Sequence, residues 1–271
     1  MSYNSFDISG KVCLITGGTS GLGKAISLGF ARAGAKVIAG SSSVSKVDAM
    51  RKELGPGHDA LQIDVADEKS VAAAVDHTVK HYGRLDAVVN AAGIIQRKPS
   101  LEVSVEEFER IVRTNLTGSF IVARNAARAM KDQSADARGH RGSIVFIASL
   151  NSYISLSEVL AYASSKSGVL GLVRGLANEW ARLGIRVNAI APGLFPTDLN
   201  RGLIENTPRG DFMKEHTPQG RFGDSEELVG AAIYLISPAA SFTAGQTLII
   251  DGGFLARGVG FPPANPNMNK A

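Results

Sequence analysis

The sequence predicts an α/β fold in which a doubly wound sheet of seven parallel strands carries helices on both faces. Short apolar runs typical of buried strands alternate with amphipathic helical patterns along the chain. A glycine-rich turn follows the first apolar run, and polar or glycine residues follow most of the others. Because such a sheet binds its ligand beyond the carboxyl ends of its strands, we expect these residues to line one site.

Each strand is expected where a short apolar run occurs, and the first run has no polar face, as in a strand buried on both sides. The expected strands are residues 12–15, 37–39, 61–63, 85–89, 143–148, 185–191 and 247–250. The expected helices are residues 22–33, 47–54, 67–82, 104–130, 157–183, a short segment within 194–223, and 224–236. Local signals support these limits: Gly34 stops the first helix, Ser104 and Glu107 form a capping box, and Asp224 caps the last helix.

The chain length of 271 residues is sufficient for one α/β domain and does not require two. No linker-like segment divides the chain, so a single domain is expected over residues 1–271. The Pro- and Gly-containing stretch 194–223 is expected to be an insertion that carries one short helix. The tail, residues 258–271, holds three prolines and three asparagines and is expected to be extended.

Composition excludes several classes of partner. The formal charge of +4 comes from scattered lysines and arginines with interleaved acids, which argues against nucleic-acid and membrane binding. No run of about twenty apolar residues predicts a membrane span, and no secretory signal is visible. The single cysteine, Cys13, lies in an apolar strand and is expected in the core, and no Cys and His pattern predicts a metal site. We therefore expect a cytoplasmic protein.

Three glycines, Gly17, Gly21 and Gly23, separate the first strand from the first helix. Glycines permit a tight turn and let backbone N–H groups approach a pyrophosphate at a helix N-terminus. Their spacing is one residue wider than the usual dinucleotide fingerprint. Their place in the first strand–turn–helix unit nevertheless favours a nucleotide site over an ordinary turn.

Tyr162 and Lys166 are four residues apart and therefore share one helix face. A lysine ammonium beside a phenol favours the phenolate and lowers a pKa that starts near ~10, so Tyr162 is a candidate general acid and base. Ser149, at the end of the fifth strand, is placed to hydrogen-bond the reacting oxygen. Taken alone, the pattern is weak, because a partly exposed tyrosine and a snorkelling lysine also fit it.

Together these motifs resemble the short-chain dehydrogenase/reductase family of the common single-domain type, and the resemblance covers residues 11–253. Residues 16–23 match the family's T-G-x-x-x-G-x-G motif, and residues 90–93 match N-N-A-G with Ala91 in place of the second asparagine. Residues matching the catalytic set and later signatures are Asn115, Ser149, Tyr162, Lys166, Pro192-Gly193 and Asp251-Gly252-Gly253. The resemblance implies a Rossmann-type fold and a single dinucleotide-binding and catalytic domain.

The resemblance also implies catalytic roles. Tyr162 would give a proton to a carbonyl oxygen or take it from an alcohol, and Ser149 would polarise that oxygen. Lys166 would bind the nicotinamide ribose, and Asn115 would hold a water that links Lys166 to solvent. The cofactor would supply the hydride.

NADP(H) is favoured over NAD(H), which remains possible, because no acid stands at the end of the second strand to repel a 2′-phosphate. Hydroxyls of Ser41, Ser42 and Ser43 stand there instead, with Lys46 nearby. The full set of implied cofactor residues is Gly17, Thr19, Ser20, Gly21, Leu22, Gly23, Ser41, Ser42, Ser43, Asp64, Val65, Asn90, Ala91, Gly93, Tyr162, Lys166, Pro192 and Gly193.

The substrate pocket is expected to have walls from residues 94–99, 150–159 and 194–223. The candidate substrate-binding residues are Arg97, Ser149, Asn151 and Tyr162. Arg97 would suit a carboxylate, although a surface arginine fits the sequence equally well. Several segments resemble family members that act on sugar acids and polyols.

The sequence therefore predicts an NAD(P)-dependent oxidoreductase that interconverts a secondary alcohol and a ketone, with a sugar acid or polyol as the substrate. The alternatives are a 3-oxoacyl or broad-range hydrophobic ketone reductase and, more remotely, a non-catalytic nucleotide-binding sensor. The helices at 104–130 and 157–183 are expected to have apolar faces that one sheet does not cover. Relatives pair these helices, so a homotetramer is expected.

Overall fold

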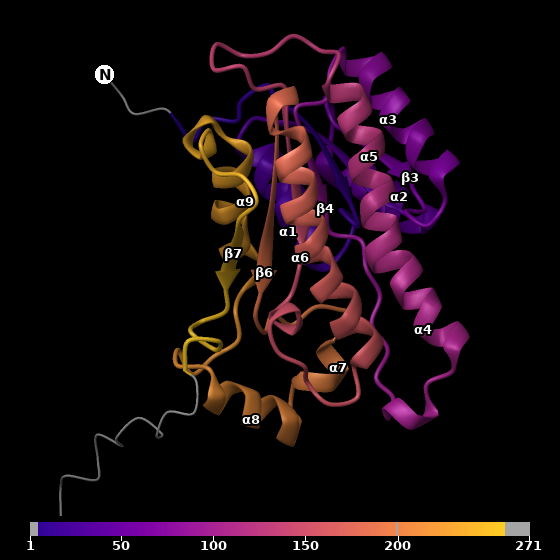
Figure 1. Ribbon diagram of the computed structural model, residues 1–271, viewed down its shortest axis with the longest axis vertical. Coiled ribbons are helices and arrows are strands. Elements are labelled where there is room, and N and C mark those ends of the chain that lie inside the picture. The colour runs from indigo at the N-terminus through magenta and orange to yellow at the C-terminus, as the bar shows by residue number, and fades with distance from the viewer. Residues whose placement is uncertain (1–4, 199, 258–271) are drawn as a thin grey trace, which may run out of the picture.

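The structure, a computed structural model, describes residues 5–198 and 200–257. Within these residues, seven strands form one parallel sheet in the order β3-β2-β1-β4-β5-β6-β7, with helices on both faces (Figure 1). The strands are β1 (Val12–Thr16), β2 (Lys36–Ser41), β3 (Asp59–Gln62), β4 (Ala87–Asn90), β5 (Gly142–Ile147), β6 (Ile185–Pro192) and β7 (Thr247–Ile250). The order reverses between β1 and β4, which confirms the predicted doubly wound fold.

The α-helices alternate with the strands along the chain. They are α1 (Gly21–Arg32), α2 (Val44–Leu54), α3 (Glu68–Tyr82), α4 (Val105–Val112), α5 (Gly118–Met130), α6 (Leu160–Trp180), α7 (Arg201–Ile204), α8 (Pro208–His216) and α9 (Val229–Ile236). Several helices begin or end at residues that the sequence marks as helix limits. The Asp67 side chain caps α3, and Gly83, with φ 80°, terminates it. The predicted capping box of Ser104 and Glu107 opens α4.

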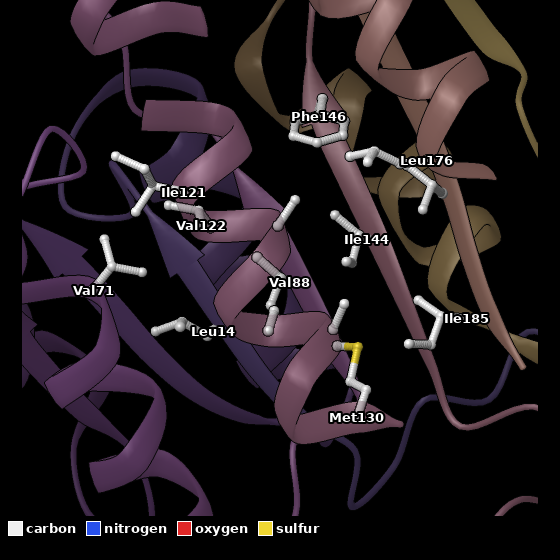
Figure 2. Packing of buried hydrophobic residues seen from close by; sticks show 14 of the residues in the cluster. Leu14, Val71, Val88, Ile121, Val122, Met130, Ile144, Phe146, Leu176 and Ile185 are labelled. Carbon is white, nitrogen blue, oxygen red and sulfur yellow. The ribbon is translucent and has the colours of Figure 1, made fainter. Parts of the chain in front are cut away.

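One face of the sheet packs against α3, α5 and α6. Val88, Ile144 and Phe146 project from the strands and belong to the same buried cluster as Val122 and Met130 of α5 (Figure 2). These side chains are almost completely withdrawn from solvent. Their burial holds α5 and α6 against the sheet. Asn115 lies just before α5, and Tyr162 and Lys166 lie in α6, so the same packing positions these candidate catalytic residues.

The opposite face packs against α1 and α9. Ile26 and Phe30 of α1 meet Cys13 and Val145 of the sheet, and Leu235 of α9 joins the same cluster. Cys13 is fully buried, as predicted for a core residue. None of the helices in the described part of the chain is long and apolar enough to cross a bilayer.

The carboxyl ends of the central strands lie side by side. Thr16 at the end of β1 pairs with Gly40 of β2 and Asn90 of β4, and Asn90 pairs in turn with Phe146 of β5. The loops that follow these strands therefore leave the sheet at one edge. Helices α7 and α8 lie beyond the same edge, past the ends of β6 and β7 at the bottom of Figure 1.

A five-residue π-helical turn, Arg113–Thr117, joins α4 to α5. The sequence predicts one helix over 104–130, and the structure divides it at this turn into α4 and α5. A π turn accommodates one extra residue, so the apolar stripe of α4 is rotated relative to that of α5. Within α4, Ile111 is buried and Val105, in the first turn, is 67% exposed.

Other limits differ by a few residues. Strand β3 begins at Asp59 rather than residue 61, because Asp59 already pairs with Ile38 of β2. Helix α6 begins at Leu160 rather than residue 157, because Glu158 has a left-handed φ of 68° that a right-handed helix does not continue. The stretch 194–223 contains two helices instead of one. The predicted extended tail, residues 258–271, lies outside the described residues.

Candidate active site

A cavity of about 200 Å³ lies at the carboxyl ends of β1, β4, β5 and β6. It brings together residues from the glycine turn, the loop after β4, the end of β5 and helix α6. The sequence-predicted residues that line it are Gly17, Ser20, Gly21, Leu22, Gly23, Ala91, Gly93, Ser149, Tyr162, Lys166, Pro192 and Gly193. These candidate catalytic and cofactor residues therefore share one site, although they come from opposite halves of the sequence.

The glycine turn has a shape that only glycine permits. Gly17 has φ 68°, and a Cβ atom there would lie 2.7 Å from the backbone nitrogen of Ala92. A Cβ atom at Gly23 would overlap the carbonyl oxygen of Gly17. Ser20 caps α1 without a side-chain hydrogen bond, and the first turn of α1 contains no acid. The N–H groups at this helix start remain available, which suits the pyrophosphate of a dinucleotide.

A buried chain of hydrogen bonds holds the strand ends against the helices. The Thr16 hydroxyl bonds to Asn90 Oδ1, and Asn90 Nδ2 donates to Ser119 Oγ at 2.7 Å. Ser119 Oγ donates to the backbone oxygen of Asn115 at 2.6 Å. The Asn90 side chain thus points into the protein and does not line the cavity, and its predicted cofactor contact stays a prediction. Its role in the structure is to join β1 and β4 to the start of α5.

Asn115 lies inside the π turn and is completely buried. Its Oδ1 accepts a hydrogen bond from Ile94 N at 2.8 Å, and its Nδ2 donates to Ile94 O at 2.9 Å and to Ser165 Oγ at 3.0 Å. A Cβ atom at Gly93 would lie 3.3 Å from Asn115 Oδ1 and 3.6 Å from Lys166 Nζ. Asn115 and Lys166 therefore converge at Gly93, and the predicted water between them stays a prediction.

Tyr162, Ser149 and Lys166 form the reactive end of the cavity. Tyr162 hydrogen-bonds to Ser149, and Ser149 Oγ accepts a second bond from Asn151 N at 3.1 Å. Lys166 Nζ lies 5.7 Å from the centre of the Tyr162 ring and donates to Ile147 O at 2.7 Å. The serine hydroxyl is thereby oriented by the backbone, and the ammonium is anchored at the end of β5.

Burial dominates the pKa values of this group. Loss of solvent raises the pKa of Tyr162, and the hydrogen bond from Ser149 opposes this rise only in part. Burial also lowers the pKa of Lys166 to about 8. The expectation that Lys166 lowers the pKa of Tyr162 therefore does not hold for the protein by itself. At neutral pH, Tyr162 keeps its proton and is ready to act as an acid.

Replacing Lys166 with methionine is expected to change the pH dependence of stability. Lys166 has a pKa of about 8 in the folded protein, against 10.5 for a free side chain. The unfolded chain therefore binds more protons between these pH values, and the stability of the wild type rises with pH there. Below pH 8 the buried ammonium costs about 3 kcal/mol, a cost that the Lys166→Met variant lacks.

Denaturant unfolding at pH 7 and pH 10 measures this difference. As the pH rises, the free energy of unfolding of the wild type should increase relative to that of Lys166→Met. Lys80→Met, at an exposed position of α3, provides the control. Its difference from the wild type in the free energy of unfolding should be the same at both pH values. An equal gap at both pH values for Lys166→Met would contradict the assigned burial of its charge.

A second, adjoining cavity of about 350 Å³ lies beside the glycine turn, and the predicted cofactor residues Thr19, Ser20 and Gly21 line it. Thr19 lines it together with Lys24 and Lys46, and the buried Thr19 Oγ1 has no hydrogen-bond partner among the described residues. Glu53 lines the same cavity and pairs with Lys24 at 2.8 Å, so the unpartnered hydroxyl and Lys46 are the groups that suit an anionic part of a ligand.

The serine turn and the residues after β3 do not line either cavity. Ser43 N donates to Ser41 Oγ at 3.2 Å, and the Ser43 hydroxyl lies 3.1 Å from that of Ser45, so the turn is ordered by its own hydroxyls. The backbone oxygen of Ser42 accepts from Gln62 Nε2 at 3.2 Å. Asp64 is exposed, with its Oδ1 bonded to Ala66 N at 2.9 Å, and Val65 is buried. The cofactor roles predicted for Ser41, Ser42, Ser43, Asp64 and Val65 stay predictions.

A third cavity, of about 100 Å³, adjoins the reactive end. The predicted substrate residues Ser149, Asn151 and Tyr162 line it, and all three predicted wall segments contribute to it. Its other lining residues are Ile95, Leu150, Leu156, Val159, Gly193, Leu194, Asn200, Ile204, Arg209 and Met213. The mixture of apolar walls and a few polar groups is typical of a small-molecule site.

The structure does not bring Arg97 into this cavity. Arg97 is instead ion-paired with Glu158 on the surface, because the loop after β4 turns outward beyond Ile95. The arginine that does line the cavity is Arg209, at the start of α8. The sequence places Arg209 in a predicted pocket wall but gives no sign of its direction. Only the arrangement of α7 and α8 reveals it.

Comparisons with known proteins agree with this geometry. Residues 17–255 match a family model described as enoyl-(acyl carrier protein) reductase. The 2-dehydro-3-deoxy-D-gluconate 5-dehydrogenase of Formosa agariphila is 37% identical, with 94% of this chain and 97% of that protein covered. The D-threitol dehydrogenase of Mycolicibacterium smegmatis is 36% identical, with 92% and 94% covered. The crystal structure of a gluconate 5-dehydrogenase from Burkholderia cenocepacia in complex with NADP and tartrate has a TM-score of 0.86 and 37% identity, with 94% and 99% covered.

Proposed function

The chain belongs to the short-chain dehydrogenase/reductase family, and from this premise we propose that it interconverts a secondary alcohol and a ketone in a sugar acid or polyol. It is an NAD(P)-dependent oxidoreductase, as the sequence predicts. The observation that carries the proposal is the single cavity that Ser149, Tyr162 and Lys166 share with the glycine turn. We also propose that residues 1–271 form one dinucleotide-binding and catalytic domain.

The proposed roles follow from the environment of each side chain. Tyr162 donates its proton to the carbonyl oxygen during reduction, and because its pKa is raised, the phenol carries this proton at neutral pH. Ser149, held by Asn151 N, donates a hydrogen bond to the same oxygen. Lys166 binds the nicotinamide ribose, and Asn115 keeps the loop after β4 in place beside it. When bound, the nicotinamide cofactor supplies or accepts the hydride.

We propose NADP(H) as the preferred cofactor. Ser41 ends β2 where an NAD-specific site would have an acid. Thr19 Oγ1 lacks a partner within the described residues, and Lys46 lines the same cavity, whereas Lys24 there is paired with Glu53. These groups together favour a 2′-phosphate, and the Burkholderia cenocepacia relative was crystallised with NADP.

A sugar acid or polyol is proposed as the substrate because the relatives named above act on such compounds. The alternative is a hydrophobic ketone or a 3-oxoacyl thioester. The apolar side chains of Leu150, Leu156, Val159 and Met213 around the third cavity favour that alternative. The two classes differ in polarity, so one assay separates them.

The test is the loss of reduced-nicotinamide absorbance with NADPH and NADH in parallel. The ketone panel contains a keto-hexonate, an uncharged keto-hexose, an aryl ketone and a 3-oxoacyl thioester. We expect the highest kcat/KM with NADPH and one of the two sugars. Higher kcat/KM for the apolar ketones would select the alternative, and preference for NADH would contradict the phosphate site. Cofactor binding without turnover of any ketone would favour a nucleotide sensor.

We further propose a homotetramer. Apolar side chains are exposed at Leu101, Val105 and Leu160, near the starts of α4 and α6, and at Phe242 before β7. Such surface area is typical of contacts between subunits. Light scattering that gives a monomer mass at micromolar concentration would contradict the proposal. A cytoplasmic location stays a prediction from the sequence.

A further inference from the structure

We propose that Arg209 forms a carboxylate subsite in the substrate cavity, and that Arg97 acts only by holding the neighbouring Glu158. This inference rests on the proposed function, since it concerns how a sugar acid is told apart from an uncharged sugar or polyol. It assigns a chemical class of ligand, a small hydroxycarboxylate, to one side chain of α8.

The Arg209 guanidinium is sheltered but has few partners. Its side chain is 24% exposed and lines the cavity that contains Ser149 and Tyr162. Its one ion pair among the described residues is with Glu158, whose Oε2 lies 3.8 Å from Nη1, a distance too long for a direct hydrogen bond. A guanidinium has five N–H donors in a planar fork. The N–H donors of Arg209 have no hydrogen-bond partner at short range among the described residues, and their fork matches the two oxygens of a carboxylate.

Local structure fixes the position of Arg209. It is the second residue of α8, and the side chain of Thr207 caps this helix by accepting from Gly210 N at 3.0 Å. Gly210 packs so closely on the preceding helix that a Cβ atom there would overlap the carbonyl oxygen of Ile204. Met213, one turn later on α8, lines the same cavity. The helix therefore presents Arg209 to the cavity on a defined backbone.

Glu158 and Arg97 complete the arrangement. Glu158 lies in the loop before α6 with a φ of 68°, and its backbone oxygen accepts a hydrogen bond from Lys98 N at 2.8 Å. Its carboxylate is ion-paired with Arg97. Two cations thus share one anion, which leaves one net positive charge beside the cavity. Because Arg97 holds Glu158 at close range, the more distant Arg209 is the cation that remains available to a ligand.

The same geometry orients the ligand. Ser149 and Tyr162 line the cavity from the end of β5 and from α6 and act on the reacting oxygen, whereas Arg209 lines the same cavity from α8. A substrate that carries a carboxylate on one carbon and a ketone on another satisfies both. An uncharged sugar uses only the first contact. Arg209 is therefore a binding residue that sets specificity, and it takes no part in proton transfer.

The test compares Arg209→Gln with Arg97→Gln, using the keto-hexonate and the keto-hexose as substrates with NADPH. Loss of a charge-assisted bidentate contact should lower kcat/KM for the acid by about 10- to 100-fold, mainly through KM. The keto-hexose should change by about 2-fold or less. Arg209→Lys should retain part of the affinity, because it keeps the charge but not the planar fork. Arg97→Gln should have a smaller effect on the acid than Arg209→Gln.

Equal losses for both substrates in Arg209→Gln would mean that Arg209 only supports the fold of α8. A larger loss of kcat/KM for the acid in Arg97→Gln than in Arg209→Gln would show that Arg97, not Arg209, binds the carboxylate, and would overturn the proposal. A second measurement, calorimetric titration of tartrate into protein saturated with NADP⁺, needs no turnover. Binding that is lost in Arg209→Gln supports the subsite even if the natural substrate is not a sugar acid. Binding that is absent in the wild type, or equal in both proteins, overturns it whatever the panel shows.

Discussion

Replacing Tyr162 with phenylalanine is expected to lower kcat by about 10²- to 10⁴-fold, the range that a positioned general acid contributes. The phenol is the proton donor for the carbonyl oxygen, and burial holds its proton in place at neutral pH. Phenylalanine fills the same space beside Ser149, so the site keeps its shape. Steady-state reduction of the best ketone with NADPH measures the loss, and fluorescence titration of NADPH should give a Kd within a few-fold of that of the wild type.

Tyr153→Phe provides the matched control, because it makes the same chemical change on a side chain that is 46% exposed. Tyr153 lies in the loop 149–159, which leads to the helix that carries Tyr162. Its kcat should stay close to that of the wild type. Undiminished turnover by Tyr162→Phe would contradict the proposed chemistry directly. A large loss in both variants would instead indicate that the loop around residues 149–159 is sensitive to any change.

Replacing Gly23 with alanine is expected to damage both folding and nucleotide binding. The new methyl group would overlap the carbonyl oxygen of Gly17 in the same turn. Because this oxygen belongs to the backbone, the clash cannot be relieved by the movement of a flexible side chain. Overpacking of this kind typically costs about 1–3 kcal/mol. Movement of the turn would also withdraw the N–H groups at the start of α1, so the Kd for NADPH should rise by about 100-fold or more.

Thermal unfolding and fluorescence titration of NADPH check the two parts separately. Gly230→Ala is the matched control, because Gly230 lies on an exposed face of α9 with no atom within 4 Å of the added Cβ. It should bind NADPH normally and gain up to about 1 kcal/mol from helix propensity. Normal affinity in Gly23→Ala would show that the turn can shift without loss of the nucleotide site.

The elements that the sequence predicts well are those whose signal is local. Alternating strand and helix patterns predict all seven strands, and the capping box at Ser104 and Glu107 locates the start of α4. The cavity residues at the glycine turn, Ser149, Tyr162 and Lys166 follow from motif and spacing, because strand ends bring them together in any parallel sheet.

The features that the sequence does not predict depend on tertiary contacts. Nothing in the residues 113–117 signals a π turn, so the division of the predicted helix 104–130 into α4 and α5 is missed. The sequence does not distinguish Arg97 from Arg209 as a ligand-binding arginine. Only the fold shows that Glu158 is ion-paired at close range with Arg97 and lies farther from Arg209. The pKa of Tyr162 moves in the opposite direction to the expectation, since the extent of burial is not visible in a four-residue spacing.

The single cysteine gives this chain a built-in reporter of unfolding. Cys13 is in the middle of β1, inaccessible to solvent, and burial raises the pKa of its thiol. A thiol reagent therefore reacts only after the central sheet has opened, because the thiolate is the reactive form. The labelling rate under native conditions then follows the opening of the most protected part of the sheet rather than the fraying of loops. With no second cysteine in the sequence, the signal from any variant comes from one known site.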